Sequence, residues 1–370
     1  MDMQNKPHRV LLCKLRHHGD VLLATPVAGA IKHVYPDCEV DMLVYQETAD
    51  MVRNNRQLRR IFTIDRNWKK QGLLKQAACE FRLLTELRKQ HYDWVLNLSD
   101  QWRAGILAKL CGRQSAGIAF QKRNNVLWKF CHTFLGKDLG NEHHITQHNL
   151  AVLDPLGFSL DHYHPEVRLD IGEADRLSLQ NKLSGLGWQG EDYVLVHPGS
   201  RWVFKCWDDD KTTELLQRLS DSGENIVLTA APDQRERRIL EQVTGRLKIT
   251  GNTKLWVLSG SLNLCELAAA IDGAKLFIGV DSAPMHMAAA LDKPQVVLFG
   301  PSWVSRWRPY SDKASVVWAG DYGSLPHPDS INTNDERRWL GAIPVEAVWQ
   351  AVQEKLGRLQ SEIEHDSGNV

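Results

Sequence analysis

The chain has 370 residues, more than one hydrophobic core usually takes, so we expect two domains. Hydrophobic residues make up 43% and charged residues 24%, as in ordinary globular proteins, and no apolar run approaches the roughly 20 residues that span a bilayer. The net charge is zero, but residues 1–150 hold 23 Lys and Arg against 14 Asp and Glu, while the remainder is acidic to the same extent.

The basic first half suggests an anionic partner: a phosphorylated substrate, a nucleic acid or an anionic membrane surface. Chance variation is the alternative. Nucleic acid is the weakest of the three because no recognised binding motif is present. The seven cysteines are scattered without a CxxC pair, which favours reduced thiols over disulfides or a zinc site. The polar first residues contain no secretory apolar region, so we expect a cytoplasmic location.

Short apolar runs alternate with helical patterns along the chain, which predicts parallel sheets covered by helices on both faces. The predicted strands are Arg9–Leu15, Glu39–Tyr45, Arg60–Ile64, Trp94–Leu98, Ser115–Ala119, Tyr193–His197, Asn225–Thr229, Leu276–Val280 and Gln295–Phe299. The predicted helices include Leu73–Gln90, Trp102–Leu110, Asp208–Ser220, Gln234–Thr244, Leu264–Ile271, Pro284–Leu291 and Pro344–Gln360.

A polar stretch with one proline, Asp161–Arg176, is interpreted as a linker that leads into a helix of the second domain. We therefore expect an α/β chain with doubly wound domains at residues 1–168 and 169–345. Residues 346–370 are expected as a C-terminal helix and tail, with packing back on the first domain as one option. In doubly wound sheets, ligands bind beyond the carboxyl ends of the strands, so those positions are the candidates for function.

The first such position is the stretch from Lys14 to Pro26, "KLRHHGDVLLATP". Asp20 falls at the start of a helix, where it is either an N-cap or a general base. Nearby positive charge would keep it ionised in either role. Arg16, His17 and His18 are expected to contact solvent or substrate, because adjacent histidines point in different directions and do not suit a metal.

The second position is "HPGSRWVFKCW", His197–Trp207. Gly199 and Ser200 offer backbone and hydroxyl donors, and Lys205 adds a positive charge, which together suit a diphosphate. The alternative is a surface loop with a structural tryptophan. The stretch is not a P-loop, because GxxxxGK[ST] is absent.

The third position is "GVDSAPMHMAAAL", Gly279–Leu291. Asp281 and Ser282 end a strand, Pro284 is well placed at a helix start, and His286 follows within the first turn. Asp281 and Ser282 cap that helix, contact a ligand, or both. No GxGxxG follows any strand, so a nicotinamide enzyme is poorly supported.

These three stretches, in this order, resemble the ADP-heptose:lipopolysaccharide heptosyltransferases, glycosyltransferase family 9. The likeness spans nearly the whole chain, and the opening stretch is most similar to members that add a branch heptose. The resemblance implies a GT-B fold, in which two Rossmann-like domains face each other across a cleft. It also implies transfer of heptose from ADP-L-glycero-β-D-manno-heptose to a heptose of the lipopolysaccharide inner core, with inversion at the anomeric carbon and without a metal or other cofactor.

The resemblance further assigns residues. It gives Asp20 the role of general base. Donor binding falls on Gly199, Ser200, Lys205, Leu262, Asp281, Ser282, Ala283, Pro284 and His286. Gln234 stands where an acidic ribose contact is expected, which leaves that contact open.

The basic first half then suits an acceptor that carries carboxylates and phosphates on a lipid anchor, reached by peripheral contact with the cytoplasmic face of the inner membrane. Candidate acceptor contacts are Arg16, His17, His18, Arg59, Arg60, Lys122 and Arg123. The alternatives are a family member with a different core acceptor, a different GT-B activity such as an epimerase, and a non-catalytic protein of this fold that binds nucleotide sugars or polyanions.

Overall fold

The chain forms two compact units, Met1–Asp170 and Ile171–Val370. The structure, a computed structural model, describes residues 6–123, 125–160 and 162–367. Residues 162–172 form neither helix nor strand, and α7 (Glu173–Gly185) opens the second unit. Asp161, the first residue of the predicted linker, lies outside the described residues.

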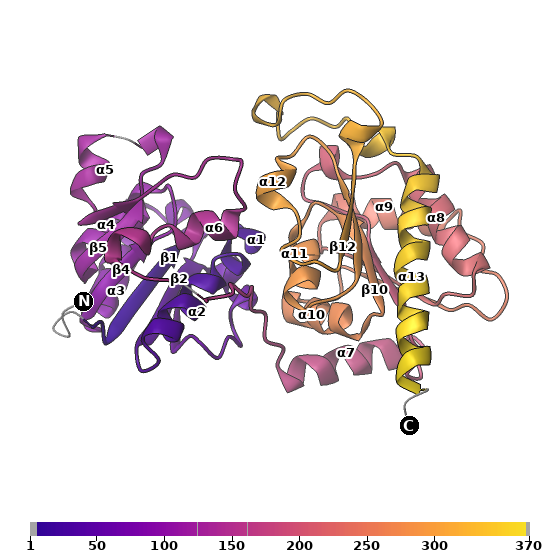
Figure 1. Cartoon of the computed structure of the whole chain (residues 1–370), viewed down its shortest axis with the longest axis horizontal. Helices are drawn as coiled ribbons and strands as arrows, with labels where there is room; N and C mark the ends of the chain where they lie inside the picture. Colours follow the sequence, from indigo (N-terminus) through magenta and orange to yellow (C-terminus); the bar gives the residue numbers. More distant parts are fainter. Residues whose placement is uncertain (1–5, 124, 161, 368–370) are drawn as a thin grey trace. The chain divides into compact units, whose positions relative to one another are not determined.

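The first unit is built on a parallel sheet in the order β3-β2-β1-β4-β5-β6 (Figure 1). Its strands are β1 (Arg9–Lys14), β2 (Glu39–Tyr45), β3 (Arg60–Ile64), β4 (Tyr92–Asn97), β5 (Gly112–Ile118) and β6 (Phe134–Gly136). Successive side chains of a strand point to opposite faces, and Leu11 and Leu12 of β1 are both fully buried. Both faces of the central strand are therefore covered, as the continuous apolar run of β1 predicts.

Helices connect these strands. They are α1 (His18–Leu22), α2 (Thr25–Val34), α3 (Leu73–Arg88), α4 (Trp102–Cys111), α5 (Val126–Phe130) and α6 (Ile145–Leu150). One core joins α3 and α4 to the sheet: Leu87 of α3 and Leu107 and Ala108 of α4 pack with Leu11 and Cys13 of β1. These apolar residues recur at helical spacing, which is why α4 buries one side and leaves the other open.

The second unit repeats the pattern with the order β12-β11-β10-β7-β8-β9, again all parallel. Its strands are β7 (Val194–His197), β8 (Ile226–Ala230), β9 (Leu255–Ser259), β10 (Leu276–Val280), β11 (Gln295–Phe299) and β12 (Ala314–Trp318). Its helices include α8 (Asp209–Asp221), α9 (Gln234–Thr244), α10 (Leu264–Gly273), α11 (Ala283–Ala290), α12 (Val304–Trp307) and α13 (Val345–Ser367).

The C-terminal helix α13 packs within the second unit. It lies against α8, β11 and β12, and Val348 and Val352 are fully buried in that unit's core. Figure 1 shows it as the yellow helix beside α8. The apolar side of α13 is thus buried in the core of the second unit.

Both sheets reverse their strand order at one place, between β1 and β4 in the first unit and between β7 and β10 in the second. Crevices at the carboxyl ends of the strands beside such a switch point are where doubly wound folds bind ligands. The segments that follow these four strands contain Asp20, Asp100, Lys205 and Asp281. Each unit therefore has one expected ligand position, fixed by topology alone.

Candidate active site

Asp20 lies in the first turn of α1, directly beyond the carboxyl end of β1, and is only 8% exposed. The N-cap position of α1 belongs to His17, whose side chain makes no capping hydrogen bond. Asp20 is therefore not the helix cap that the sequence left open as an alternative. Its carboxylate is buried at the switch point without a capping duty.

Two arginines and a second carboxylate surround this position. Arg16 Nε lies 3.8 Å from Asp20 Oδ1, and Arg16 Nη1 lies 3.3 Å from Oδ1 of Asp100, which follows β4. Arg123, which follows β5, donates from Nε to the Asp100 carbonyl at 2.8 Å, and its guanidinium lies 5.5 Å from the ring centre of Trp102. The loops after three neighbouring strands thus bring Arg16, Asp20 and Arg123 together. Sequence reasoning missed Asp100, although it follows a predicted strand.

Three further residues that the sequence predicts as acceptor contacts, His17, His18 and Lys122, follow strands of the same sheet. His18 Nε2 is 2.9 Å from the Glu47 carbonyl, which fixes its ring against the turn after β2. Lys122 is exposed in the turn Gln121–Arg123, next to the anchored Arg123. His17 is half-buried at the start of α1. Their role in acceptor binding stays a prediction.

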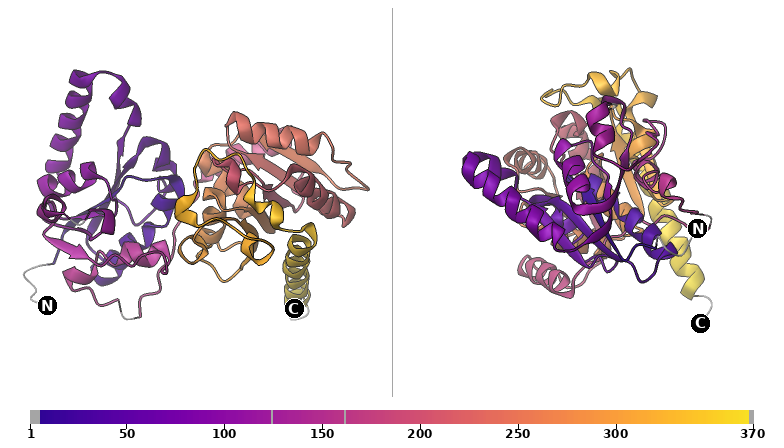
Figure 2. Two further views of the ribbon diagram at one scale, coloured as in Figure 1. Left: turned by 90° about the horizontal axis from the view of Figure 1, so that it is seen from above. Right: turned by 90° about the vertical axis from the view of Figure 1, so that its left-hand side faces the viewer.

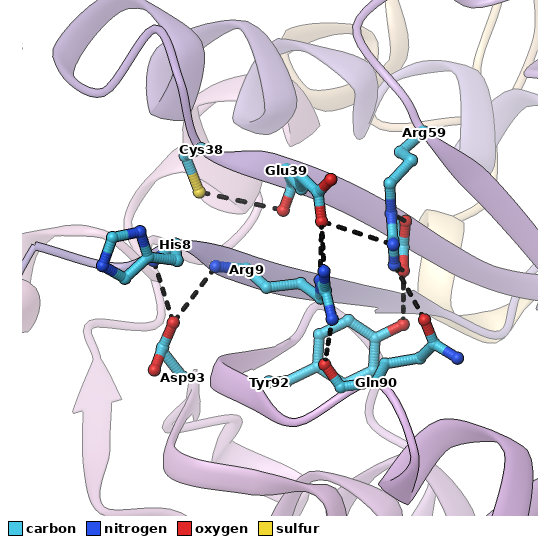
Figure 3. A network of polar contacts seen from close by, with 9 residues as sticks. His8, Arg9, Cys38, Glu39, Arg59, Gln90, Tyr92 and Asp93 are labelled. Atoms are coloured by element: carbon cyan, nitrogen blue, oxygen red, sulfur yellow. Dashed lines mark hydrogen bonds and ion pairs between the residues drawn. The ribbon is translucent and has the colours of Figure 1, made fainter.

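Arg59 and Arg60 lie at the other end of the sheet. Arg59 pairs bidentately with the fully buried Asp41, and its Nη1 lies 3.3 Å from Glu39 (Figure 3). The Tyr92 hydroxyl donates to Asp41 at 2.6 Å, and burial together with this bond raises the pKa of Tyr92. Glu39, Arg60 and Tyr92 are the first residues of β2, β3 and β4, so this network sits at the amino edge.

The amino edge is opposite the edge that holds Asp20, because all strands of the sheet are parallel. The guanidinium of Arg59 is already satisfied by carboxylates there. The structure therefore gives Arg59 a structural contact and does not bring Arg59 or Arg60 together with Asp20. Their role in acceptor binding stays a prediction.

In the second unit, an ion pair spans the switch point. Lys205 Nζ lies 2.5 Å from Oδ2 of Asp281, and the two side chains are 12% and 6% exposed. Lys205 comes from the loop after β7 and Asp281 from the end of β10. The ammonium also lies 5.0 Å from the ring centre of Trp202, a distance typical of a cation–π contact. The predicted cation is thus held in place at the predicted edge.

The loop after β7 packs against a buried acid, Glu236, at Gly199. Glu236, in the first turn of α9, accepts from the Ala231 amide at 2.9 Å, and its Oε2 lies 3.5 Å from Nε2 of His197. Burial alone would raise the pKa of Glu236, but the interactions with His197 and the Ala231 amide hold it below its usual value. A Cβ on Gly199 would lie 2.6 Å from Oε2 of Glu236, so only glycine lets this loop approach α9 so closely.

Gln234, which stands where the sequence leaves a ribose contact open, is exposed at the start of α9. Asp233, the N-cap residue before it, is also exposed, whereas Glu236 is buried beneath Gly199. The ribose contact stays an open prediction. Sequence reasoning gave no role to Glu236 or to His197, because the 3.5 Å approach of these two side chains is not visible in the order of the residues.

The other predicted donor residues also lie in the second unit. Ser282 stands at the N-cap of α11 but donates its hydroxyl to the Val280 carbonyl at 3.1 Å, so it does not cap the helix. Pro284 and His286 are buried in α11, and Ala283 begins it. Ser200 is 7% exposed in the loop after β7, and Leu262 is half-buried just before α10. Their contacts with a donor stay predictions.

Within the described ranges, no three His, Cys, Asp or Glu side chains gather as metal ligands would. Leaving aside the few residues that are not described, no helix is long and apolar enough to cross a membrane.

Solved structures share this architecture. The glycosyltransferase family 9 protein from Veillonella parvula DSM 2008 superposes with a TM-score of 0.82 at 21% identity, covering 97% of this chain and 99% of that one. Escherichia coli heptosyltransferase WaaC with ADP superposes with a TM-score of 0.74 at 20% identity, covering 94% and 99%. Two doubly wound units, each with charged groups at its switch point, define a GT-B protein.

The sequence comparisons narrow that class. The model of glycosyltransferase family 9 (heptosyltransferase) matches residues 80–336. Lipopolysaccharide heptosyltransferase 3 of Escherichia coli (strain K12) is 34% identical over 346 residues, which is 92% of this chain and 96% of that protein. The chain belongs to glycosyltransferase family 9. Lys205 and Asp281 lie inside the residues that the family model matches, whereas Asp20 precedes them.

Proposed function

We propose that this protein transfers L-glycero-D-manno-heptose from ADP-heptose to a heptose of the lipopolysaccharide inner core, adding the branch heptose with inversion. The observation that carries this proposal is the 34% identity to lipopolysaccharide heptosyltransferase 3 across 92% of the chain. The second unit would bind the donor and the first unit the acceptor. Because this acceptor is anchored by lipid, the protein would work at the cytoplasmic face of the inner membrane.

The proposed reaction assigns a task to each switch point. Asp20 would accept the proton of the acceptor hydroxyl as its oxygen attacks the anomeric carbon of the heptose. A carbon–oxygen bond forms there while the bond to the diphosphate breaks, and that electron pair leaves with ADP. Lys205 is placed to stabilise the negative charge that grows on the diphosphate, which is the kind of preorganised electrostatic help that lowers barriers most. No metal is needed in this scheme.

Arg16 and Arg123 would bind anionic groups of the acceptor. Both are anchored through Asp100, which leaves further N–H groups of each planar guanidinium for carboxylates or phosphates. Arg16 also lies beside Asp20, with Nε 3.8 Å from Oδ1, so an acceptor group bound by Arg16 would lie near the proposed base.

The test is a mass-spectrometric transfer assay with ADP-heptose and a core acceptor that lacks only the branch heptose. Wild-type protein should add one heptose, and Asp20→Asn should nearly abolish the addition while still binding ADP. Asp37→Asn is the matched control, because Asp37 is a carboxylate of the same unit with a side chain that is 91% exposed. ADP binding without transfer by the wild type would instead favour a different acceptor or a protein that only binds nucleotide sugars.

A further inference from the structure

Exposed apolar side chains are concentrated on one side of the first unit. In the described part of residues 1–170, every exposed large hydrophobic side chain belongs to α3, α4 or α5. We call this surface the α3–α5 face, and its residues are Leu73, Leu74, Phe81, Ile106, Leu110, Val126, Leu127 and Phe130. Soluble proteins rarely expose so many large apolar groups together without a binding partner.

The three helices form a continuous layer. Arg103 of α4 pairs with Glu80 of α3, and Lys109 of α4 lies 4.9 Å from the ring centre of Phe130 in α5. The opposite side of α4 packs on the sheet, so Ile106 and Leu110 point outward between the two neighbours. Figure 1 labels these helices on one side of the first unit, and in Figure 2 the long purple helix α3 stands open along its length.

The side chains of α5 differ strongly in their exposure to solvent. Trp128 is fully buried and donates from Nε1 to the Ile118 carbonyl at 3.0 Å, which anchors the helix on the unit. Val126, Leu127 and Phe130 are 82%, 67% and 67% exposed. A rigidly held helix that presents three apolar side chains to solvent is the geometry of a shallow membrane anchor.

The charge of this region selects the partner. The three helices of this face carry two acidic residues, Glu80 and Glu86, which pair with Arg103 and Arg82, and six basic residues, namely Lys75, Arg82, Arg88, Arg103, Lys109 and Lys129. Basic residues around an apolar patch attract anionic lipids, because each cation near the surface adds to the binding. A second copy of the chain would bring the same positive charge to the contact and be repelled.

We propose that the α3–α5 face docks on an anionic lipid bilayer, with Val126, Leu127 and Phe130 entering the headgroup region and Lys109 and Lys129 contacting lipid phosphates. The inference deepens the proposed function and rests on it for its purpose, since a lipid-anchored acceptor must be met at a membrane. Trp102, whose ring centre lies 5.5 Å from the Arg123 guanidinium of the Asp20 site, is the first residue of α4, and Arg123 precedes α5 by three residues. Docking through this face therefore brings acceptor sugars beside that site.

The test is sedimentation of the full-length protein with vesicles of phosphatidylcholine alone or with phosphatidylglycerol added, in the absence of any substrate. We expect binding only to the anionic vesicles. Leu127→Ser combined with Phe130→Ser should lower the partition coefficient by about a hundredfold, because each large apolar side chain that no longer enters the lipid costs roughly tenfold. Lys109→Gln combined with Lys129→Gln should also lower it at low salt, and the difference from wild type should shrink as salt is added, because salt screens the attraction between cations and anionic lipids.

The matched control is Leu177→Ser with Leu186→Ser, two exposed leucines of the second unit, which should leave vesicle binding unchanged. ADP binding and turnover with a delipidated acceptor should be equal in all of these variants. Equal vesicle binding by wild type and Leu127→Ser/Phe130→Ser would overturn the proposal. So would a wild-type dimer that this variant dissociates, since the face would then join two copies.

The two proposals can fail separately. If the wild type transfers heptose to the delipidated acceptor but does not bind anionic vesicles, the docking surface is wrong and the enzyme stands. If vesicle binding follows the expected pattern but no acceptor receives heptose, the surface stands and the proposed reaction is wrong.

Discussion

Asp20 is the side chain whose loss should separate chemistry from folding. It caps no helix, and its contact with Arg16 at 3.8 Å is worth well under about 1 kcal/mol. We therefore expect Asp20→Asn to reduce transfer by roughly 10²–10⁴-fold, the usual effect of losing a positioned base, with the melting temperature nearly unchanged. Turnover and differential scanning calorimetry on the same preparation check this. Transfer that equals wild type would move the base elsewhere.

The contribution of the Lys205–Asp281 pair to stability can be measured separately from its contribution to ADP binding. Lys205→Met leaves the buried Asp281 carboxylate without its cation, which typically destabilises a protein by about 3–5 kcal/mol. Adding Asp281→Asn removes the uncompensated charge and should restore most of that stability. ADP binding should stay at least about tenfold weaker in both variants, because the cation for the diphosphate is absent.

Urea unfolding and calorimetric ADP titration distinguish these effects. If the double variant regains wild-type ADP affinity, Lys205 serves the fold and not the donor.

Glu236 should make stability depend on pH. Its pKa in the folded protein is held below the unfolded value of about 4.3. The stability that it contributes is therefore fully present above about pH 4.3 and is lost as the pH falls through the lower, folded pKa. Glu236→Gln should be less stable than wild type at neutral pH, and the difference should shrink in acid. A difference that stays constant from neutral pH to about pH 3 would contradict this assignment.

At the scale of strands and helices, the two edges of the first sheet have different tasks. Arg59→Met leaves the fully buried Asp41 without its guanidinium and should lower the free energy of unfolding by about 3 kcal/mol. Its kcat should be close to wild type, because the network lies at the amino edge. Arg123→Met should weaken acceptor binding and leave the free energy of unfolding close to wild type. Arg123 is only partly buried, and it lies at the Asp20 edge.

Steady-state kinetics and urea unfolding of the two variants form the test. For Arg123→Met we expect a higher KM for the acceptor with little change in stability. A loss of acceptor affinity in Arg59→Met, at full stability, would return Arg59 to the acceptor site.

The elements found from sequence are those with long apolar runs. All nine predicted strands are present, with ends shifted by at most three residues, because buried parallel strands are nearly continuous in hydrophobic residues. The three missed strands, β6, β9 and β12, are the outer strands of their sheets. β6 has only three residues, and β9 and β12 are partly exposed, so their apolar signal is short or interrupted.

The same limit applies to the sites. The positions of Asp20, Lys205 and Asp281 follow from strand ends, which a sequence reveals. Their neighbours do not follow, because Arg16 meets Arg123 only through Asp100, more than 80 residues from Arg16 in the chain. The same limit applies to Arg59. Its charge is visible in the sequence, but its pairing with the buried Asp41 is not.

At the scale of the whole molecule, one topology is used twice with different chemistry. Both sheets have the same strand order and the same switch point, but the first unit places a carboxylate and arginines there and the second a lysine–carboxylate pair. The proposed assignment of acceptor and donor to different units therefore rests on these loops and not on the fold. Each substrate should therefore change hydrogen exchange in one unit only.

Hydrogen exchange on the full chain measures which peptides each substrate protects. ADP at about 100 times its dissociation constant stabilises the state that binds it by about 2.7 kcal/mol. Protection should therefore appear in peptides around Gly199–Lys205 and Asp281–His286, while peptides from α1 and from Asp100–Arg123 keep their exchange rates. A delipidated acceptor should give the opposite pattern, and Lys205→Met should remove the ADP effect without altering the acceptor effect. Protection of the first unit by ADP alone would mean that the nucleotide binds there, and the roles that we assign to the two units would have to be exchanged.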